Sequence, residues 1–253
     1  MSAGTGGPAT EPLPAWRVEE FASLASTQAL LRERLSAGAT VHGSVLRALE
    51  QPAGRGRGGK SWASLPGGSY QSLAVHDRWQ GALRGRGLTL ALALHLAEEL
   101  RAAGAAASVK WPNDVYLGAG KLAGVLSEYV SGHLIVGIGL NVNNPVPDGA
   151  AALRGWELDY VHELVLAAVR AGLASVVEAG ERAPEALRLA ERLAPVDHLR
   201  GREVTVRAAK STIRGRAAGV GVDGALLVDT GEATIRVTDG TVLSWSVYNG
   251  LSS

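Results

Sequence analysis

Hydrophobic residues recur at helical spacing in several parts of the chain. The first such stretch runs from Ser26 to Gly38, and the Ser26 hydroxyl can cap the free amides at the start of a helix. A second apolar stretch ends at Gly104, a residue type that commonly closes helices. The predicted helices span residues 26–38, 88–103, 156–179 and 184–193.

Shorter apolar runs bounded by glycine-containing turns predict strands. Before Pro195, strands are expected at residues 41–49, 70–75, 109, 115–117, 123–130 and 134–140. Beyond Gly201, strand-like pieces follow at residues 204–208, 213–220, 225–228 and 233–237, with no helical pattern between them. The first set mixes with helices without strict alternation and predicts an α+β domain around a mixed sheet. The second set predicts a small β-barrel.

The length of 253 residues leaves room for one large domain and one small one. We expect the large domain over residues 15–198 and the small one over residues 199–253. Residues 1–14 are rich in Gly, Pro, Ser, Thr and Ala, without a basic start or an apolar run, and predict a flexible tail rather than a signal peptide. The longest apolar stretch, residues 88–96, is too short to cross a membrane, so no membrane association is expected.

The composition excludes several classes of chemistry. The chain has no cysteine, which rules out disulfides, thiolate zinc sites and a cysteine nucleophile, and fits a cytoplasmic protein. Its six histidines are scattered without metal-ligand spacing, and no Gly-x-Ser-x-Gly nucleophile motif is present. The net charge of +1 gives no overall field that would favour DNA, so we expect no DNA partner.

One glycine-rich loop, Gly54-Arg55-Gly56-Arg57-Gly58-Gly59-Lys60, concentrates positive charge. Its backbone can close on an anion while the guanidinium and ammonium groups neutralise the charge, so phosphate or carboxylate is the natural guest. The loop also satisfies the dinucleotide pattern G-x-G-x-x-G, but a turn follows at residues 64–68 where that fold requires a helix. A single short arginine-glycine copy also argues against an RNA-binding repeat. The remaining alternative is an ordinary solvated basic hairpin.

Two lysine-containing segments follow, Lys110-Trp111-Pro112-Asn113-Asp114 and Lys121-Leu122-Ala123-Gly124. A fixed ammonium at Lys121 would stabilise charge that develops on a phosphoryl oxygen during nucleophilic attack. The alternative is a surface lysine at a turn. In the first segment, Asn113 and Asp114 are equally well explained as turn residues that satisfy backbone amides.

Five segments in this order resemble the biotin protein ligases. They are Ser26-Thr27-Gln28, the arginine-glycine loop with Gln51, residues 110–114, residues 121–128, and Gly137-Ile138-Gly139-Leu140-Asn141. The resemblance implies that biotin and ATP are converted to biotinyl-5′-AMP, and that biotin is then transferred to a lysine of a biotin carboxyl carrier protein. It also implies an SH3-like C-terminal domain. Because only a short low-complexity tail precedes Trp16, the monofunctional type without a DNA-binding domain is expected.

The resemblance also implies roles for individual residues. It makes Lys121 and Arg57 catalytic, and Asp114 a ligand of Mg²⁺. It implies biotin contacts from Ser26, Thr27, Gln28, Gln51, Arg55, Gly56, Arg57, Lys121, Gly124 and Leu126. It implies nucleotide contacts from Arg55, Lys60, Trp62, Asn113 and Asn141.

Several alternatives remain open at this stage. Gln28 replaces the usual asparagine and keeps a donor and an acceptor on a longer arm. Ser26 is also a plain helix cap, Trp62 a loop-packing aromatic, and Asn141 a strand-end turn residue. We expect the arginines of the loop to gain partners only when ligand is present. A lipoate ligase-type acyltransferase, a non-catalytic biotin- or nucleotide-binding protein and a nucleic-acid module remain competing functions, and both a monomer and a homodimer are compatible with the sequence.

Overall fold

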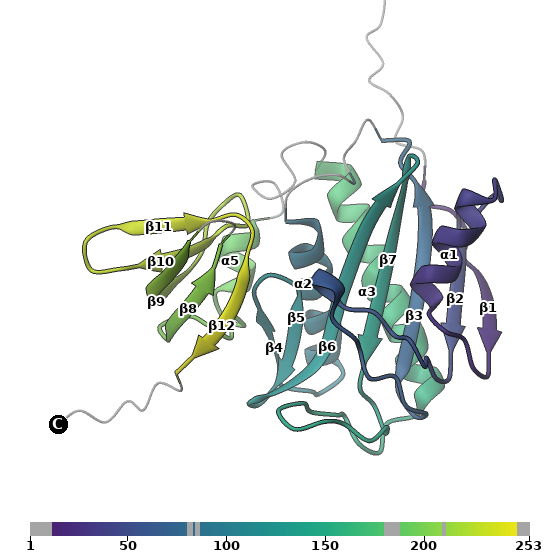
Figure 1. Cartoon of the computed structure of the whole chain (residues 1–253), viewed down its shortest axis with the longest axis horizontal. Coiled ribbons are helices and arrows are strands. Elements are labelled where there is room, and N and C mark those ends of the chain that lie inside the picture. The colour runs from purple at the N-terminus through teal and green to yellow at the C-terminus, as the bar shows by residue number, and fades with distance from the viewer. Residues whose placement is uncertain (1–11, 80–82, 84–86, 180–187, 209–210, 247–253) are drawn as a thin grey trace, which may run out of the picture.

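A seven-stranded mixed sheet forms the centre of the larger part of the protein (Figure 1). The computed structural model describes residues 12–79, 83, 87–179, 188–208 and 211–246. The strand order is β1-β2-β3-β7-β6-β5-β4, in which β1 runs parallel to β2 and all other neighbours are antiparallel. The strands are β1 (Arg17–Phe21), β2 (Ser44–Ala48), β3 (Ser69–His76), β4 (Ala107–Lys110), β5 (Asp114–Leu117), β6 (Gly120–Val130) and β7 (His133–Leu140).

Helices cover the two faces of this sheet unequally. α1 (Thr27–Ser36) contacts β2, β3 and β7, while α2 (Leu88–Ala102) contacts β4, β5 and β6 and packs along α3 (Leu158–Ala179). A short helix, α5 (Leu189–Leu193), leads towards the second sheet. Figure 1 shows α1 in front of the sheet, with α2 and α3 behind it. α1 thus lies on one face of the sheet, and α2 and α3 lie on the other.

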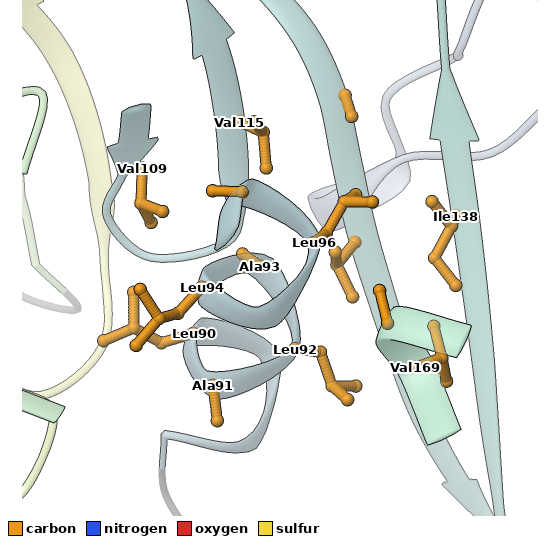
Figure 2. Packing of buried hydrophobic residues seen from close by; sticks show 14 of the residues in the cluster. Leu90, Ala91, Leu92, Ala93, Leu94, Leu96, Val109, Val115, Ile138 and Val169 are labelled. Carbon is orange, nitrogen blue, oxygen red and sulfur yellow. The ribbon is translucent and has the colours of Figure 1, made fainter. Parts of the chain in front are cut away.

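The main core lies between α2, α3 and the sheet (Figure 2). Side chains of Val109 and Val115 point towards α2, which is apolar around most of its circumference, and Ile138 lies beside Val169 of α3. α3 is long and apolar enough to span a membrane, but most of its apolar window is buried within the protein, which is typical of a core helix. This packing holds the sheet in position and leaves polar side chains on its opposite face.

Replacing Leu94 by alanine tests how much this core contributes. Leu94 is fully buried in α2, and such a truncation removes transfer free energy and leaves a cavity. We expect the free energy of unfolding to fall by about 2–5 kcal/mol. Urea denaturation followed by circular dichroism measures this loss. Val222→Ala, at an exposed position, should change the same quantity by less than about 0.5 kcal/mol.

A second, antiparallel sheet forms the small C-terminal β domain that the sequence predicts. Its strands are β8 (Glu203–Arg207), β9 (Thr212–Val220), β10 (Leu226–Asp229), β11 (Thr234–Val237) and β12 (Thr241–Trp245), in the order β11-β10-β9-β8-β12. The indole Nε1 of Trp111 donates a hydrogen bond of 3.0 Å to the carbonyl of Gly224 and links the two sheets. The α+β class with a mixed sheet is confirmed.

The element boundaries differ from the prediction in a few places. β1 and β12 were not predicted, and the third helix begins at Leu158 rather than at residue 156. The expected helix over residues 184–193 is seen only from Leu189, because residues 184–187 lie outside the described part. Of the expected tail over residues 1–14, residues 1–11 are likewise outside it, whereas the carbonyl of Pro14 accepts a hydrogen bond of 2.7 Å from Arg170.

Candidate active site

A cavity of about 710 Å³ opens on the face of the seven-stranded sheet opposite α2 and α3. α1, the arginine-glycine loop, β5, β6 and β7 contribute to its wall, and the end of β8 and the turn between β11 and β12 complete it. The structure brings together in this lining all but one of the predicted residues: Ser26, Thr27, Gln28, Gln51, Arg55, Gly56, Arg57, Lys60, Trp62, Asn113, Asp114, Lys121, Gly124 and Leu126. Asn141 is the exception.

The strand register explains why the cavity has this position. Lys110, Asp114, Gly124 and Gly139 are successive partners across β4, β5, β6 and β7. Directly paired residues project to the same face of a sheet, whereas their chain neighbours project to the other. The neighbours Val109 and Val115 point towards α2, and Ile138 towards Val169 of α3, as Figure 2 shows. This row therefore lies on the cavity face.

Glycines form a flat floor in the middle of the row. A Cβ atom added at Gly139 would collide with the indole of Trp62, and one at Gly124 would lie 3.2 Å from the same ring. A Cβ at Gly137 would lie 2.6 Å from Oε1 of Gln28. The absence of side chains at these positions lets flat groups lie directly on the sheet.

The end of the cavity beside α1 is polar but uncharged. The backbone N and Oγ1 of Thr27 donate hydrogen bonds of 2.8 and 3.0 Å to Oε1 of Gln51, and Oγ1 also lies 2.7 Å from Oγ of Ser72. Gln28 is buried; its Nε2 donates to the carbonyl of Ile135 at 3.4 Å, and its Oε1 has no partner. Such a set of amide and hydroxyl groups suits a neutral ring with its own donors and acceptors.

Ser26 has the structural role that the sequence predicts. It is the N-cap of α1, and its Oγ accepts a hydrogen bond of 3.4 Å from the backbone N of Ala29. This cap places the first turn of α1, with Thr27 and Gln28, against the cavity. The capping role and a position in the cavity lining are therefore compatible.

The catalytic candidate Lys121 pairs with Asp114, the expected ligand of Mg²⁺. Its Nζ lies 2.7 Å from Oδ1 of Asp114, and the side chains are 31% and 14% exposed. The same Nζ lies 5.1 Å from the centroid of the Trp62 ring. A carboxylate, an ammonium and an aromatic face thus meet above Gly124. Because the lysine remains partly exposed, an incoming phosphate can reach it.

Asp114 fits only a magnesium ion that a nucleotide helps to bind. Among the residues that the structure describes, there is no cluster of three or more histidine, aspartate or glutamate side chains suited to a metal. Magnesium commonly keeps several water ligands and binds through one or two carboxylates together with substrate phosphates. Asp114, a single carboxylate beside the cationic part of the cavity, matches binding of magnesium through one carboxylate and substrate phosphates.

Arg57 already has partners, which corrects the expectation that the loop arginines gain them only with ligand. Its Nη2 donates to Oδ1 of Asp239 at 2.9 Å, and its Nη1 donates to Oδ1 of Asn113 at 3.3 Å. Asp239 lies in the turn between β11 and β12, which local sequence patterns could not place beside the loop. Gly58 and Gly59 adopt φ angles of 64° and 76°, the left-handed conformation that glycine adopts most readily.

Asn113 and Asn141 have structural contacts. Nδ2 of Asn113 donates to the carbonyl of Val125 at 2.8 Å. Nδ2 of Asn141 donates to the carbonyls of Ala151 and Lys121 at 3.0 and 3.4 Å, and its Oδ1 accepts from Asn144. Asn141 therefore lies outside the cavity lining. Its side chain supports the backbone that carries Lys121.

The sequence reasoning gave no role to several lining residues, namely Ser72, Lys110, Arg207 and Asp239. For Lys110 a signal existed: a lysine directly after Val109 in a short strand indicates a polar face behind the core. Arg207 and Asp239 carry no comparable local signal. They enter the site only because the second sheet packs against the first.

Comparison with known proteins places this arrangement in a family. The model of the biotin/lipoate A/B protein ligase family matches residues 20–143. The bifunctional ligase/repressor BirA of Escherichia coli is 32% identical over 234 residues, which cover 87% of this chain and 69% of that protein. The chain belongs to the biotin/lipoate A/B protein ligase family.

Other relatives agree with this membership. The biotin--[acetyl-CoA-carboxylase] ligase of Mycobacterium tuberculosis is 36% identical over 138 residues, so the alignment spans 50% of each chain. Among solved structures, a biotin protein ligase from Aquifex aeolicus in complex with biotin and ATP superposes with a TM-score of 0.77 at 29% identity, covering 90% of this chain and 98% of that one. The predicted resemblance to biotin protein ligases is confirmed, and the likeness extends over both sheets.

Proposed function

We propose that this family member activates biotin with ATP to form biotinyl-5′-AMP and then transfers biotin to a lysine of a biotin carboxyl carrier protein. The observation that carries the proposal is one continuous cavity with two chemically different ends. The end at Thr27, Gln28 and Gln51 offers uncharged donors and acceptors, and the other end gathers Arg57, Lys60 and Lys121. A neutral ring with a carboxylate tail matches the uncharged end. The phosphates of a nucleoside triphosphate match the cationic end.

In the first step, the carboxylate of biotin attacks the α-phosphorus and pyrophosphate leaves. The ureido ring of biotin binds beside α1, where the unpaired Oε1 of Gln28 accepts an N–H. Arg57 neutralises the carboxylate and the α-phosphate as they approach each other. Negative charge grows on the nonbridging oxygens during attack, and Lys121 stabilises it once its ammonium turns from Asp114 to the phosphate.

The same cavity supports binding of the nucleotide. Trp62 lies over the glycine floor and offers an aromatic face on which adenine stacks. When magnesium is bound with the nucleotide, it offsets the charge of the phosphates, and Asp114 is the residue that would hold it. In the second step, the amine of the carrier lysine attacks the carbonyl of the mixed anhydride, an amide bond forms and AMP leaves.

An assay of pyrophosphate release tests the proposal and its main alternative. The purified chain is supplied with ATP and Mg²⁺, together with biotin, lipoate or neither acid. We expect release that depends on biotin, followed by attachment of biotin to an added carrier domain. Release with lipoate alone would instead identify a lipoate ligase-type enzyme, and no release with either acid would leave a non-catalytic binding protein.

We propose domain limits at residues 15–198 and 199–253, with the carrier protein as the macromolecular partner and the cytoplasm as the compartment. The net charge of +1 supports the absence of a DNA partner. Size-exclusion chromatography with light scattering distinguishes a monomer from a homodimer.

A further inference from the structure

A β-bulge in β6 turns Lys121 towards the cavity. In the ladder between β5 and β6, Ala123 is the partner of Val115. The adjacent Tyr116 is the partner of Lys121, so Leu122 is an extra residue without a partner in β5. Both Leu122 and Ala123 are fully buried in the main core, although consecutive residues of a regular strand point to opposite faces. Because the extra residue shifts this alternation by one position, Lys121 points into the cavity instead of into the core.

A loop supports the bulge along the edge of β6 that faces away from β5. Where β7 has ended, a parallel bridge joins Lys121 to Ala150. The backbone N of Lys121 donates a hydrogen bond of 3.0 Å to the carbonyl of Gly149, and its carbonyl accepts one of 2.9 Å from the backbone N of Ala151. A Cβ atom added at Gly120 would lie 2.8 Å from backbone atoms of Ala150 and Ala151. The glycine therefore lets the loop approach β6 closely.

Two buried asparagines connect this loop to the end of β7. Nδ2 of Asn141 donates hydrogen bonds of 3.4 and 3.0 Å to the carbonyls of Lys121 and Ala151. Nδ2 of Asn144 donates to Oδ1 of Asn141 at 3.1 Å, and Oδ1 of Asn144 accepts from the backbone N of Val142 at 3.0 Å. Asn144 is only 1% exposed. It thus fixes the orientation of the Asn141 amide, which in turn holds the carbonyl of Lys121.

The direction of the Lys121 backbone decides where its ammonium lies. The side chain is partly exposed, and its ion pair with Asp114 opens when the ammonium turns to a phosphate, as the proposed function requires. A lysine ammonium is carried on a flexible four-carbon stem. Misplacing a catalytic group by about 1 Å can lower a rate about a hundredfold. Support of the bulge therefore affects the reaction without any contact to substrate.

We propose that Asn144 is a positioning residue for adenylation, which acts through Asn141 and the bulge at Leu122 to aim Lys121 at the α-phosphate. The inference rests on the proposed function in taking Lys121 as the catalytic cation. Asn144 lies outside the cavity lining, so its effect on the reaction is indirect. The relay from Asn144 to Lys121 consists of two hydrogen bonds, each of which ends on a buried amide or a backbone carbonyl.

Amide hydrogen exchange, followed by NMR, tests the support of the bulge without turnover. In Asn144→Ala, the amides of Lys121 and Ala151 should exchange about tenfold faster than in the unmodified chain, because losing a buried hydrogen bond eases local opening. Asn143→Ala is the matched control. The Asn143 side chain belongs to the same turn but bonds to the backbone of residues 155–156. This control should leave both amides within about twofold of their original exchange rates.

Kinetics separate positioning from general damage to the fold. Asn144→Ala should slow single-turnover adenylation by about tenfold, while the Kd for biotin, measured by calorimetry, changes by less than about twofold. In a Lys121→Ala background the same substitution should cause little further loss, because the residue through which it acts is missing. Asn144→Asp keeps the acceptor for the Val142 amide and removes only the donor to Asn141. It should slow adenylation in the same way, and it decides the question if the alanine variant does not fold.

Unchanged exchange at Lys121 and Ala151 in the Asn144 variants would overturn the inference. Additive losses in the Lys121→Ala background, or a biotin affinity that falls as much as the rate, would overturn it as well. The exchange measurement does not depend on turnover. If the unmodified chain released no pyrophosphate with biotin, the proposed function would fail, whereas faster exchange in the Asn144 variants would still show that the relay holds Lys121.

Discussion

Replacing Lys121 by alanine is expected to slow formation of biotinyl-5′-AMP by a factor of about one hundred or more, since one preorganised electrostatic contact is commonly worth that much. The ammonium lies above Gly124, where the reacting phosphate would rest, and pairs with the partly exposed Asp114. Its contact with the phosphate strengthens as charge develops in the transition state. Single-turnover adenylation, followed by rapid quench with labelled ATP, measures the effect.

Biotin affinity provides the control for this variant. The groups that face the uncharged end of the cavity, Thr27, Gln28 and Gln51, do not contact Lys121 in the structure. The dissociation constant for biotin should therefore change by less than about threefold. A near-normal adenylation rate in Lys121→Ala would remove this residue from the mechanism.

Replacing Arg57 by alanine should release the adenylate from the site about ten to one hundred times faster, because hydrogen bonds to charged groups contribute roughly 1.5–3 kcal/mol. The guanidinium bridges Asn113 on the first sheet and Asp239 on the second. With the mixed anhydride bound, we expect the same forked group to turn to its phosphate. Filter-binding decay of preformed biotinyl-5′-AMP gives the rate.

Asp239→Asn is the informative companion to that variant. It removes the carboxylate that pairs with Arg57 but keeps the guanidinium. If the phosphate and Asp239 compete for Arg57, the asparagine variant should retain the adenylate at least as long as the unmodified chain does. Faster loss in both variants would mean that the ion pair itself closes the cavity.

The sequence predicted most of the fold because the core segments have strong patterns. α2 is apolar over almost its whole length, and β3, β6 and β7 are long enough to be recognised from their own residues. β1 escaped prediction because four of its five residues are exposed, as befits an edge strand. β12 buries only Val242 fully, and its pattern did not stand out from the preceding turn.

Residues that the sequence singled out on short segments lie together in the structure. The arginine-glycine loop, Lys121 and Gly124 line one cavity, as expected from their resemblance to a family. Asn141, for which a nucleotide contact stays a prediction, lies outside the cavity lining and donates hydrogen bonds to the carbonyls of Lys121 and Ala151. The contact of Asp239 with Arg57 could not be predicted, because it arises only when the two sheets pack together. Arg57 and Asp239 are separated by 182 positions along the chain.

The position of Trp62 provides an internal optical reporter. Its indole lies against the backbone of Gly139, close to the ammonium of Lys121, with a buried Nε1 that lacks a hydrogen-bond partner. Indole emission responds to nearby charge, stacking and solvent, so a ligand that occupies the floor must alter the fluorescence of this residue. With Trp62→Phe supplying the background of the other five tryptophans, stopped-flow mixing would time the arrival of biotin and ATP separately, without attaching a dye.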